Sequence, residues 1–266
     1  MTFEVLISTM HQADYSLLDK MKITTDAVVI NQCNNNSIKR FMRGKCSVLW
    51  INTTDRGLSK SRNMALKNAT ADICLISDDD LEYRKDYDKQ IISAFEKNEQ
   101  ASIMSFEVKG IEKEFKKYPI MAQRVGYIKS LRIASVEIAF KRCDIIDNKI
   151  IFDELIGAGT RFLLGEENAF LFHCLKRKLK IFFTPTIIAD LHLLSSTWRK
   201  GFNKDFFIAK GASFAAMKTS LTQLLILQWA VRKYKLYKKD MSLWKAILLM
   251  NKGKQEYLKE VKKNDT

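Results

Sequence analysis

The chain has 266 residues, 47% of them hydrophobic and 11% aromatic, which allows a buried core and excludes a disordered protein. Two prolines and ten glycines leave no Pro/Gly-rich linker, and five cysteines without C-x-x-C spacing argue against a zinc site and favour free thiols in a reducing compartment. The net charge is +15, and residues 199–266 supply most of it with 16 Lys/Arg against 5 Asp/Glu. Such a basic tail seeks an anionic partner, and the charge alone leaves phospholipid, nucleic acid and acidic protein open.

The first hundred residues alternate short β-rich runs with helical patterns. Strands are predicted over 3–8, 27–31, 47–51 and 73–77, and helices over 15–22, 58–68 and 86–97. The strand segments are nearly continuous in apolar residues, as expected for a parallel sheet buried on both faces. The pattern therefore predicts an α/β fold with a doubly wound, mostly parallel sheet flanked by helices. In such sheets the ligand lies beyond the carboxyl ends of the strands.

The rest of the chain is more mixed. Strands are predicted over 101–107, 134–142, 180–183 and 187–192, and a helix over 166–178, whose acidic start and basic end suit the helix dipole. From residue 199 onward the pattern is helical, with apolar stripes over 221–231 and 243–250 followed by lysines. These stripes carry Trp229 and Trp244, and they fit either a helix in the membrane interface or a face packed on the preceding domain.

The sequence predicts no membrane-spanning segment. The N-terminus MTFEVLIST has no basic region followed by the apolar stretch of a signal peptide. No apolar run reaches the roughly 18 residues that a spanning helix needs. We therefore expect a cytoplasmic protein.

Three adjacent carboxylates, Asp78, Asp79 and Asp80, follow directly on a predicted apolar strand. Adjacent acids that are partly removed from water repel each other, so a compensating positive charge is expected. A hard cation such as Mn²⁺ or Mg²⁺ binds one or two carboxylates together with phosphate oxygens. The alternative is a solvated loop whose acids cap the next helix.

The segment RGLSKSRNMALKNATADICLISDDD resembles the region leading into the DxD metal motif of family 2 glycosyltransferases, which are inverting enzymes of the GT-A type. The matching residues are Gly57, Ser59, Arg62, Asn63 and the aspartate triplet. The resemblance implies that Arg62, with Asp78 and Asp79, holds the nucleotide-sugar and that Asp80 is the principal ligand of Mn²⁺ or Mg²⁺. Either Ser77 takes the place of the first aspartate of the motif, or Asp78 and Asp80 form it.

A second block, FDELIGAGTRFLLGEENAFLFHCLKRKLKIFFTPTIIADLHLLSSTW, is similar to the same family. The matching residues are Phe152–Asp153, Gly157 to Gly159, Glu166–Glu167, Pro185 and His192. The resemblance implies that Glu167 is the general base, beside Glu166, although the family more often has Asp at this position. It also implies a sugar and acceptor loop with Gly157, Gly159 and Trp198. His192 would be a third metal ligand with Asp78 and Asp80. The alternatives are ordinary first-turn acids for the two glutamates and a structural role for His192.

Four residues at the ends of the first two strands are expected to contact the nucleotide. Ser8 and Thr9 end the first strand, and Asn31 and Gln32 end the second. Relatives commonly carry Pro-Thr-Tyr-Asn and Asp-Asp at these places, but amides also hydrogen-bond base edges. The base of the donor is therefore left open, with UDP preferred.

The resemblance covers residues 3–198 and implies a GT-A catalytic domain over 1–198, with a nucleotide-sugar half over about 1–100 and an acceptor half over about 101–198. Residues 199–266 would be a basic helical extension. The implied enzyme is a hexosyltransferase-like, metal-dependent inverting transferase that builds a bacterial capsule or exopolysaccharide. Its acceptor would be lipid-linked, and its basic helices would contact the anionic inner face of the cell membrane.

Three rival interpretations remain at this point. A nucleotidyltransferase would normally show a glycine-rich phosphate loop after the first strand, where this chain has MHQAD. A nucleic-acid-binding protein would leave the acidic triplet without a purpose, because acids repel phosphate. A degenerate transferase kept as an assembly partner would not need Asp80 and Glu167.

Overall fold

The computed structural model describes residues 1–193 and 201–264, which group into two compact units. Unit 1 contains residues 1–56 and 60–151 together with the described part of 174–196. Unit 2 contains residues 57–59 and 152–173 together with the described part of 197–266. The sequence prediction places 152–173 in the catalytic domain, whereas the fold groups this segment with the C-terminal helices.

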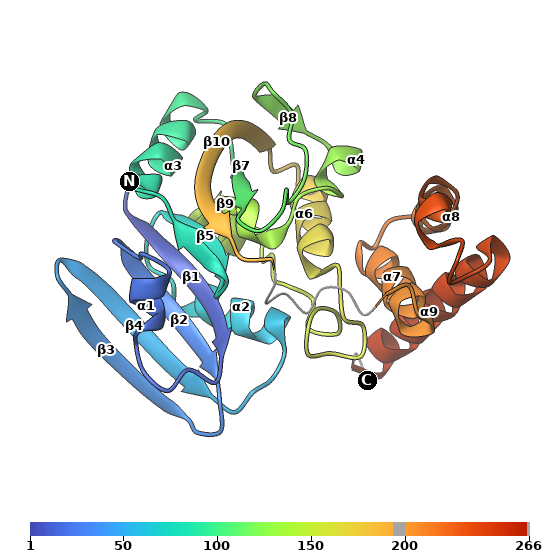
Figure 1. Ribbon diagram of the computed structural model, residues 1–266, viewed down its shortest axis with the longest axis horizontal. Coiled ribbons are helices and arrows are strands. Elements are labelled where there is room, and N and C mark those ends of the chain that lie inside the picture. The colour runs from blue at the N-terminus through green and yellow to red at the C-terminus, as the bar shows by residue number, and fades with distance from the viewer. Residues whose placement is uncertain (194–200, 265–266) are drawn as a thin grey trace. The chain divides into compact units, whose positions relative to one another are not determined.

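Within the described residues, ten strands of unit 1 form one sheet (Figure 1). Its first part is parallel and consists, in spatial order, of β4 (Cys46–Thr53), β2 (Asp26–Gln32), β1 (Phe3–Met10) and β5 (Ile73–Asp78). Next come β9 (Ile138–Lys141), antiparallel to both neighbours, then β7 (Ile103–Gly110) and β10 (Ile181–Leu191), which are parallel to each other. The antiparallel β3 (Ser37–Arg43) and β6 (Leu81–Tyr83) lie at the two ends, and β8 (Gln123–Val125) also pairs with β10.

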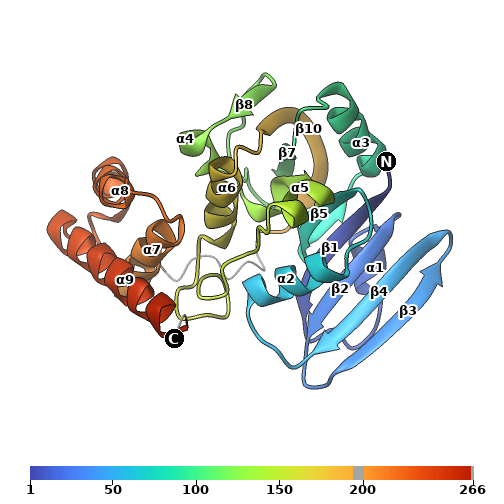
Figure 2. The same ribbon diagram turned by 180° about the vertical axis from the view of Figure 1, so that it is seen from behind.

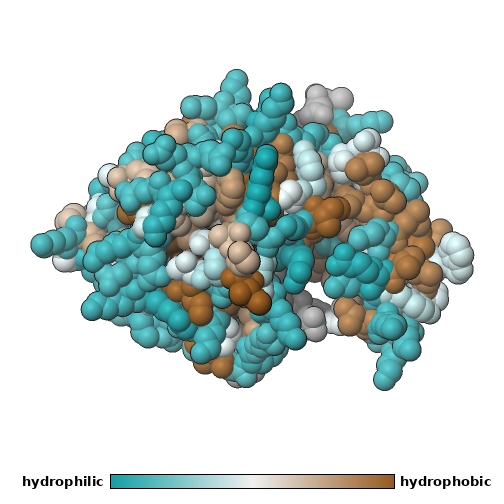
Figure 3. Space-filling view, turned by 90° about the horizontal axis from the view of Figure 1, so that it is seen from above, coloured by the Kyte–Doolittle hydropathy of each residue, from teal (hydrophilic) through white to brown (hydrophobic). Residues whose placement is uncertain are grey.

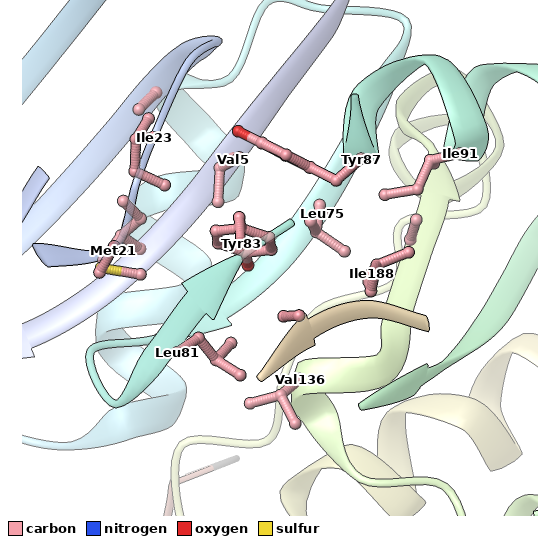
Figure 4. Close-up of a cluster of buried hydrophobic side chains, with 14 of the residues drawn as sticks. Val5, Met21, Ile23, Leu75, Leu81, Tyr83, Tyr87, Ile91, Val136 and Ile188 are labelled. Carbon is pink, nitrogen blue, oxygen red and sulfur yellow. The ribbon is translucent and has the colours of Figure 1, made fainter. Parts of the chain in front are cut away.

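Helices cover both faces of this sheet. The short α1 (Leu17–Lys20) and α3 (Tyr87–Lys97) pack on one face, where Val5, Leu75 and Tyr83 meet Tyr87 in a single apolar cluster (Figure 4). On the other face lie α2 (Leu58–Asn68) and α5 (Arg142–Asp147) (Figure 2). Because successive strand residues point to opposite faces, both faces need apolar side chains, which explains the continuous apolar runs. The predicted α/β fold is confirmed.

The strands missed by the sequence analysis carry weak local signals. The edge strand β3 reads SIKRFMR and has mostly exposed side chains, while β6 is three residues long. The two strands predicted around Pro185 are one continuous strand, because the proline falls where the pairing register with β7 shifts. A proline is tolerated at such an irregularity, since no ladder hydrogen bond is required there. The segment predicted as a strand from Ala134 starts with a 3-10 turn, Ser135–Glu137, and only then becomes β9. A short helix, α4 (Tyr127–Ser130), precedes that turn.

Unit 2 is helical. The helix α6 (Glu166–Lys176) begins in it, and α7 (Lys204–Ala216), α8 (Thr222–Tyr237) and α9 (Leu243–Asn264) complete it. In Figure 2, α7 and α9 lie side by side. Their backbones touch at two glycines: a Cβ on Gly211 would lie 1.8 Å from the Met250 carbonyl oxygen, and one on Gly253 would lie 1.9 Å from that of Ile208. Across the described ranges, no helix combines the length and apolar character that spanning a membrane requires.

Candidate active site

The parallel pairing of unit 1 brings the predicted nucleotide residues into one row. Thr9 pairs with Asn31, Asn31 pairs with Asn52, and Ser8 pairs with Asp78. Ser8, Thr9, Asn31 and Gln32 are all buried. The strand ends therefore place polar side chains of β1, β2, β4 and β5 next to one another. They lie at the carboxyl ends of the strands, where ligands bind in open α/β sheets.

The amide of Asn31 is engaged within the protein. Its Nδ2 donates to Asn52 Oδ1 at 2.8 Å and to the Gln12 carbonyl oxygen at 2.9 Å, and its Oδ1 accepts from the Gln12 backbone N at 3.0 Å. Asn31 thus holds the loop after β1 in place, and contact with a base stays a prediction for it. Gln12 and Asn52 were not among the predicted site residues. Only the pairing of β4 with β2 shows that Asn52 is adjacent.

Each carboxylate of the aspartate triplet has a different environment. Asp78 ends β5 and pairs with Arg62 through Nη2 and Oδ1 at 2.8 Å, and the Arg62 side chain is 2% exposed. Ser135 Oγ lies 3.4 Å from the second oxygen of Asp78. Thr9 Oγ1 donates to Asp79 Oδ2 at 2.5 Å. Asp80 Oδ1 is buried and has no hydrogen-bond partner among the residues that the structure describes.

The environment of Asp80 favours the neutral carboxyl. Burial, and then the charges of Asp78 and Asp79, raise the pKa of Asp80 to about 7. A buried oxygen without a partner costs free energy unless a donor or a cation approaches it. The Asp80 carboxyl is therefore a group that a bound cation would stabilise in its ionised form.

His192 follows β10 and lies close to the triplet, since its backbone N donates to the Asp80 carbonyl oxygen at 2.9 Å. Its imidazole is held elsewhere: Nε2 lies 2.9 Å from Glu82 Oε1 and Nδ1 lies 3.1 Å from Glu112 Oε1. These hydrogen bonds raise the pKa of His192. In this arrangement the ring bridges two carboxylates. The predicted metal-ligand role of His192 stays a prediction, and Glu82 and Glu112 are neighbours that the sequence analysis missed.

The metal implied by the family fits Asp80 better than it fits the full predicted ligand set. Among the described residues, no three His, Cys, Asp or Glu side chains are grouped closely enough to hold an ion on their own. The buried Asp80 Oδ1, which has no hydrogen-bond partner in the described part of the chain, is nevertheless the kind of ligand a hard cation takes. Mg²⁺ and Mn²⁺ sites often use one or two carboxylates and complete their shell with water and substrate phosphate oxygens. The residues present fit a cation that shares its ligands with a diphosphate.

In unit 2 the predicted glycine loop packs on residues 57–59. Leu58 N donates to the Ala158 carbonyl oxygen at 2.9 Å, and Ser59 Oγ donates to that of Ile156 at 2.7 Å. Gly159 has a φ of +83°, and a Cβ there would lie 3.1 Å from the Gly57 Cα. Both the backbone conformation and the close approach require glycine at this position.

The predicted catalytic glutamates open α6 after this loop. Glu166 is 4% exposed, and a Cβ on Gly157 would lie 3.2 Å from its carboxylate, so Gly157 leaves room for that group. Glu167 is half-buried. The half-buried Lys210 of α7 interacts electrostatically with Glu167, which opposes the lowering of the Lys210 pKa by burial. The Lys210 ammonium also lies 4.9 Å from the centroid of the Phe214 ring. The role of Glu167 as general base stays a prediction.

The segment that carries these residues is fastened to α9. Tyr257 OH donates to Asp153 Oδ2 at 2.5 Å, and Arg161 Nη2 lies 2.9 Å from Glu256 Oε2. The rings of Phe162 and Tyr257 meet edge to face. The C-terminal helices thus support the predicted acceptor loop directly. Trp198, the last predicted member of that loop, lies outside the described residues.

Comparison with known proteins identifies the family. The model of glycosyl transferase family 2 matches residues 15–154. Among solved structures, S. aureus TarS 1-349 aligns with a TM-score of 0.62 at 14% identity, covering 90% of this chain and 74% of that chain. The same TarS fragment in complex with UDP-GlcNAc aligns with a TM-score of 0.61 at 15% identity and the same two coverages. Longer TarS aligns with a TM-score of 0.59 at 14% identity, covering 94% of this chain and 55% of that chain.

A search of curated proteins finds no match. At 14–15% identity the structural likeness shows a shared GT-A fold, whereas the family match covers more than half of the chain. The chain belongs to glycosyl transferase family 2 and is a glycosyltransferase.

Proposed function

We propose that this glycosyltransferase moves a sugar from a nucleotide-diphosphate donor, with UDP as the nucleotide, to a hydroxyl of a glycan with inversion at the anomeric carbon. The observation that carries the proposal is the cluster at the strand ends, where Arg62 is paired with Asp78 and the buried Asp80 Oδ1 has no hydrogen-bond partner within residues 1–193 and 201–264. The aligned TarS structures in complex with UDP-GlcNAc and with UDP lend further support.

Unit 1 would hold the donor. Asp80, with Asp78, would bind Mn²⁺ or Mg²⁺, which when bound neutralises the charge of the departing diphosphate. Arg62 fixes Asp78 through their ion pair. Thr9 holds Asp79 through a hydrogen bond that its hydroxyl donates. Such fixed geometry reduces the reorganisation needed when charge develops in the transition state.

Unit 2 would supply the proton acceptor. As the acceptor oxygen bonds to the anomeric carbon, the bond from that carbon to the diphosphate oxygen breaks, and Glu167 takes the hydroxyl proton. A single displacement of this kind inverts the configuration. Lys210 interacts electrostatically with Glu167. We therefore assign Lys210 as a positioning residue for the base.

We further propose a lipid-linked acceptor of the capsule or exopolysaccharide class and peripheral attachment to the inner face of the cell membrane. An exposed apolar face, defined here as the α8 apolar face, begins at the N-cap residue of α8 and continues along the helix. It consists of Leu221, Leu224, Leu227 and Val231, with exposed fractions of 40–63%. Lys235 and Lys238 continue this face toward the end of the helix. Hydrophobic side chains gather on the α7–α9 side of Figure 3. An apolar helix face next to lysines suits an anionic membrane interface.

The donor assignment is tested by calorimetry with UDP. Wild type should bind UDP in the presence of Mn²⁺ and bind it much more weakly in its absence, and Asp80→Ala should lose the metal-dependent part. Metal-dependent binding of a different nucleoside diphosphate would change the donor and keep the mechanism. Absence of any metal-dependent nucleotide binding by the wild type would contradict the proposal.

The membrane assignment is tested by co-sedimentation with vesicles containing anionic phospholipid. Leu224→Glu should reduce binding by about tenfold or more, because it places a charge within the α8 apolar face. Gln223→Glu is the matched control, since Gln223 is exposed on the same helix beside that face and the charge change is identical. Equal binding of both variants would argue against the α8 apolar face as the contact.

A further inference from the structure

The loop after β1 carries a glutamine that none of the roles above uses. Gln12 is half-buried and follows His11, whose backbone takes the left-handed conformation with a φ of +55°. This conformation is uncommon for a residue with a Cβ, and such residues cluster at functional sites. The backbone N of His11 donates to the Gln32 carbonyl oxygen at 3.1 Å. The chain therefore turns at His11 while it stays attached to the end of β2.

The backbone of Gln12 is held by the side-chain amide of Asn31. Asn31 Oδ1 accepts from the Gln12 backbone N at 3.0 Å, and Asn31 Nδ2 donates to the Gln12 carbonyl oxygen at 2.9 Å. The same Nδ2 donates to Asn52 Oδ1 on β4 at 2.8 Å. The two bonds to Gln12 use its backbone alone. Asn31 therefore fixes the position from which the Gln12 side chain starts, and a change of that side chain leaves this attachment in place.

The side-chain amide of Gln12 reaches back to the end of β1. Its Nε2 donates to Thr9 Oγ1 at 3.0 Å and to the Met10 carbonyl oxygen at 3.3 Å. Thr9 Oγ1 in turn donates to Asp79 Oδ2 at 2.5 Å. A hydroxyl has one hydrogen, so a Thr9 hydroxyl that donates to the carboxylate accepts from the amide. The hydrogen bonds thus run in one direction, from Gln12 through Thr9 to Asp79.

The two ends of this chain of hydrogen bonds differ in their access to water. Thr9 is buried, whereas the Asp79 side chain is exposed. An exposed side chain moves among rotamers, and fixing it when a ligand binds costs conformational entropy. A hydroxyl that accepts one hydrogen bond donates another more strongly, because successive bonds polarise each other. The amide of Gln12 therefore strengthens the bond that holds Asp79 before any ligand arrives.

We infer that Gln12 is a positioning residue for donor binding, which acts through the Thr9 hydroxyl to hold Asp79 in the orientation that the metal-bound nucleotide requires. It also joins the amides at the ends of β2 and β4 to the aspartate triplet in one hydrogen-bonded network. The role toward the donor rests on the proposed function. The hydrogen bonds themselves do not, since they form in the free protein.

The test is a double-mutant cycle on UDP binding to the full chain in the presence of Mn²⁺, measured by calorimetry. Gln12→Met removes the amide and keeps the side-chain length, so it should weaken UDP binding by about two- to tenfold, the equivalent of one hydrogen bond. Thr9→Val removes the hydroxyl, and in this background Gln12→Met should change UDP binding by less than about twofold. Thr9→Ser keeps the hydroxyl and should preserve the full effect of Gln12→Met.

Gln90→Met on α3 is the matched control, since Gln90 is exposed outside the proposed site and the chemical change is identical. It should bind UDP as the wild type does. Urea unfolding of the proteins of the cycle repeats the measurement without nucleotide. Coupling between Gln12 and Thr9 is expected there too, because their hydrogen bond exists in the free protein.

The outcomes separate a positioning role from a structural one. Coupling in unfolding but additive effects on UDP binding would leave Gln12 a structural role and overturn the inference. Wild-type UDP binding by Gln12→Met, or equal losses in Gln12→Met and Gln90→Met, would overturn it as well while the donor proposal stands. Absence of metal-dependent nucleotide binding by the wild type would overturn the donor proposal and, with it, the role of Gln12.

Discussion

In unit 1 the candidate residues stand at the ends of paired strands, whereas in unit 2 they stand on a loop and at the start of a helix. Thr9 and Asn31 are placed by backbone pairing, which also sets the distance between them. Glu167 is placed by a loop that Gly159 lets approach Gly57 and that Tyr257 fastens to α9. The first arrangement depends on the register of the sheet, the second on side-chain contacts with distant helices.

This difference suggests that the two units have separate functions, which can be measured separately. Donor binding should depend on unit 1 and survive changes in unit 2. Transfer should depend on both. The following predictions are ordered from the largest expected effect to the smallest.

Replacement of the proposed base has the largest expected effect. Glu167→Gln should lower kcat by about 10²–10⁴-fold, because the glutamine amide cannot take the proton of the acceptor hydroxyl. UDP binding should stay at the wild-type level, which calorimetry checks beside a transfer assay. Glu96→Gln on α3 makes the same chemical change at an exposed position outside the proposed site and should retain activity. Loss of UDP binding in Glu167→Gln would contradict the proposal that donor binding depends on unit 1 alone.

Replacement of Arg62 should destabilise unit 1. Arg62→Met leaves Asp78 without its ion pair, and breaking a buried pair costs about 3–5 kcal/mol of unfolding free energy. The lower end of that range is expected, because the Asp78 side chain is 18% exposed. Urea unfolding provides the measurement. Adding Asp78→Asn to Arg62→Met should recover part of the loss, and failure to do so would place the cost in packing of the Arg62 side chain.

The glycine contact between α7 and α9 tests the assembly of unit 2. Gly253→Ala would place a Cβ 1.9 Å from the Ile208 carbonyl oxygen, so the two helices must separate. We expect a loss of about 1–3 kcal/mol, as for overpacked sites. Gly126→Ala is the matched control, since a Cβ there meets no atom within 4 Å. Thermal unfolding compares the stabilities of the two variants. An unfolding temperature of Gly253→Ala equal to that of the wild type would show that α7 and α9 can move apart at little cost.

The ion pair between Arg161 and Glu256 should matter least. Arg161 is 61% exposed, and water screens such a pair, so Arg161→Ala should cost about 0.2–1 kcal/mol. Chemical unfolding measures this small effect. A loss well above that range would mean that the packing of Arg161 against the Phe162 ring, 5.5 Å from its centroid, carries the attachment of the loop.

The residues themselves determined the core strands β1, β2, β4 and β5 and the helix α2, because apolar continuity and helical periodicity are local properties of the chain. The same holds for the candidate aspartates and glutamates, whose family pattern is contiguous in the sequence. The edge strands β3 and β6 were missed, since their local patterns are short or polar.

Only the tertiary structure decided which groups meet. Asn31 and Asn52 are 21 positions apart, and His192 and Glu82 are 110 positions apart. No local pattern encodes such pairs, because they depend on strand order and on where loops return. The same reason applies to Lys210 beside Glu167. The sequence determined which chemical groups the protein has, and the packing of distant segments decided what each of them contacts.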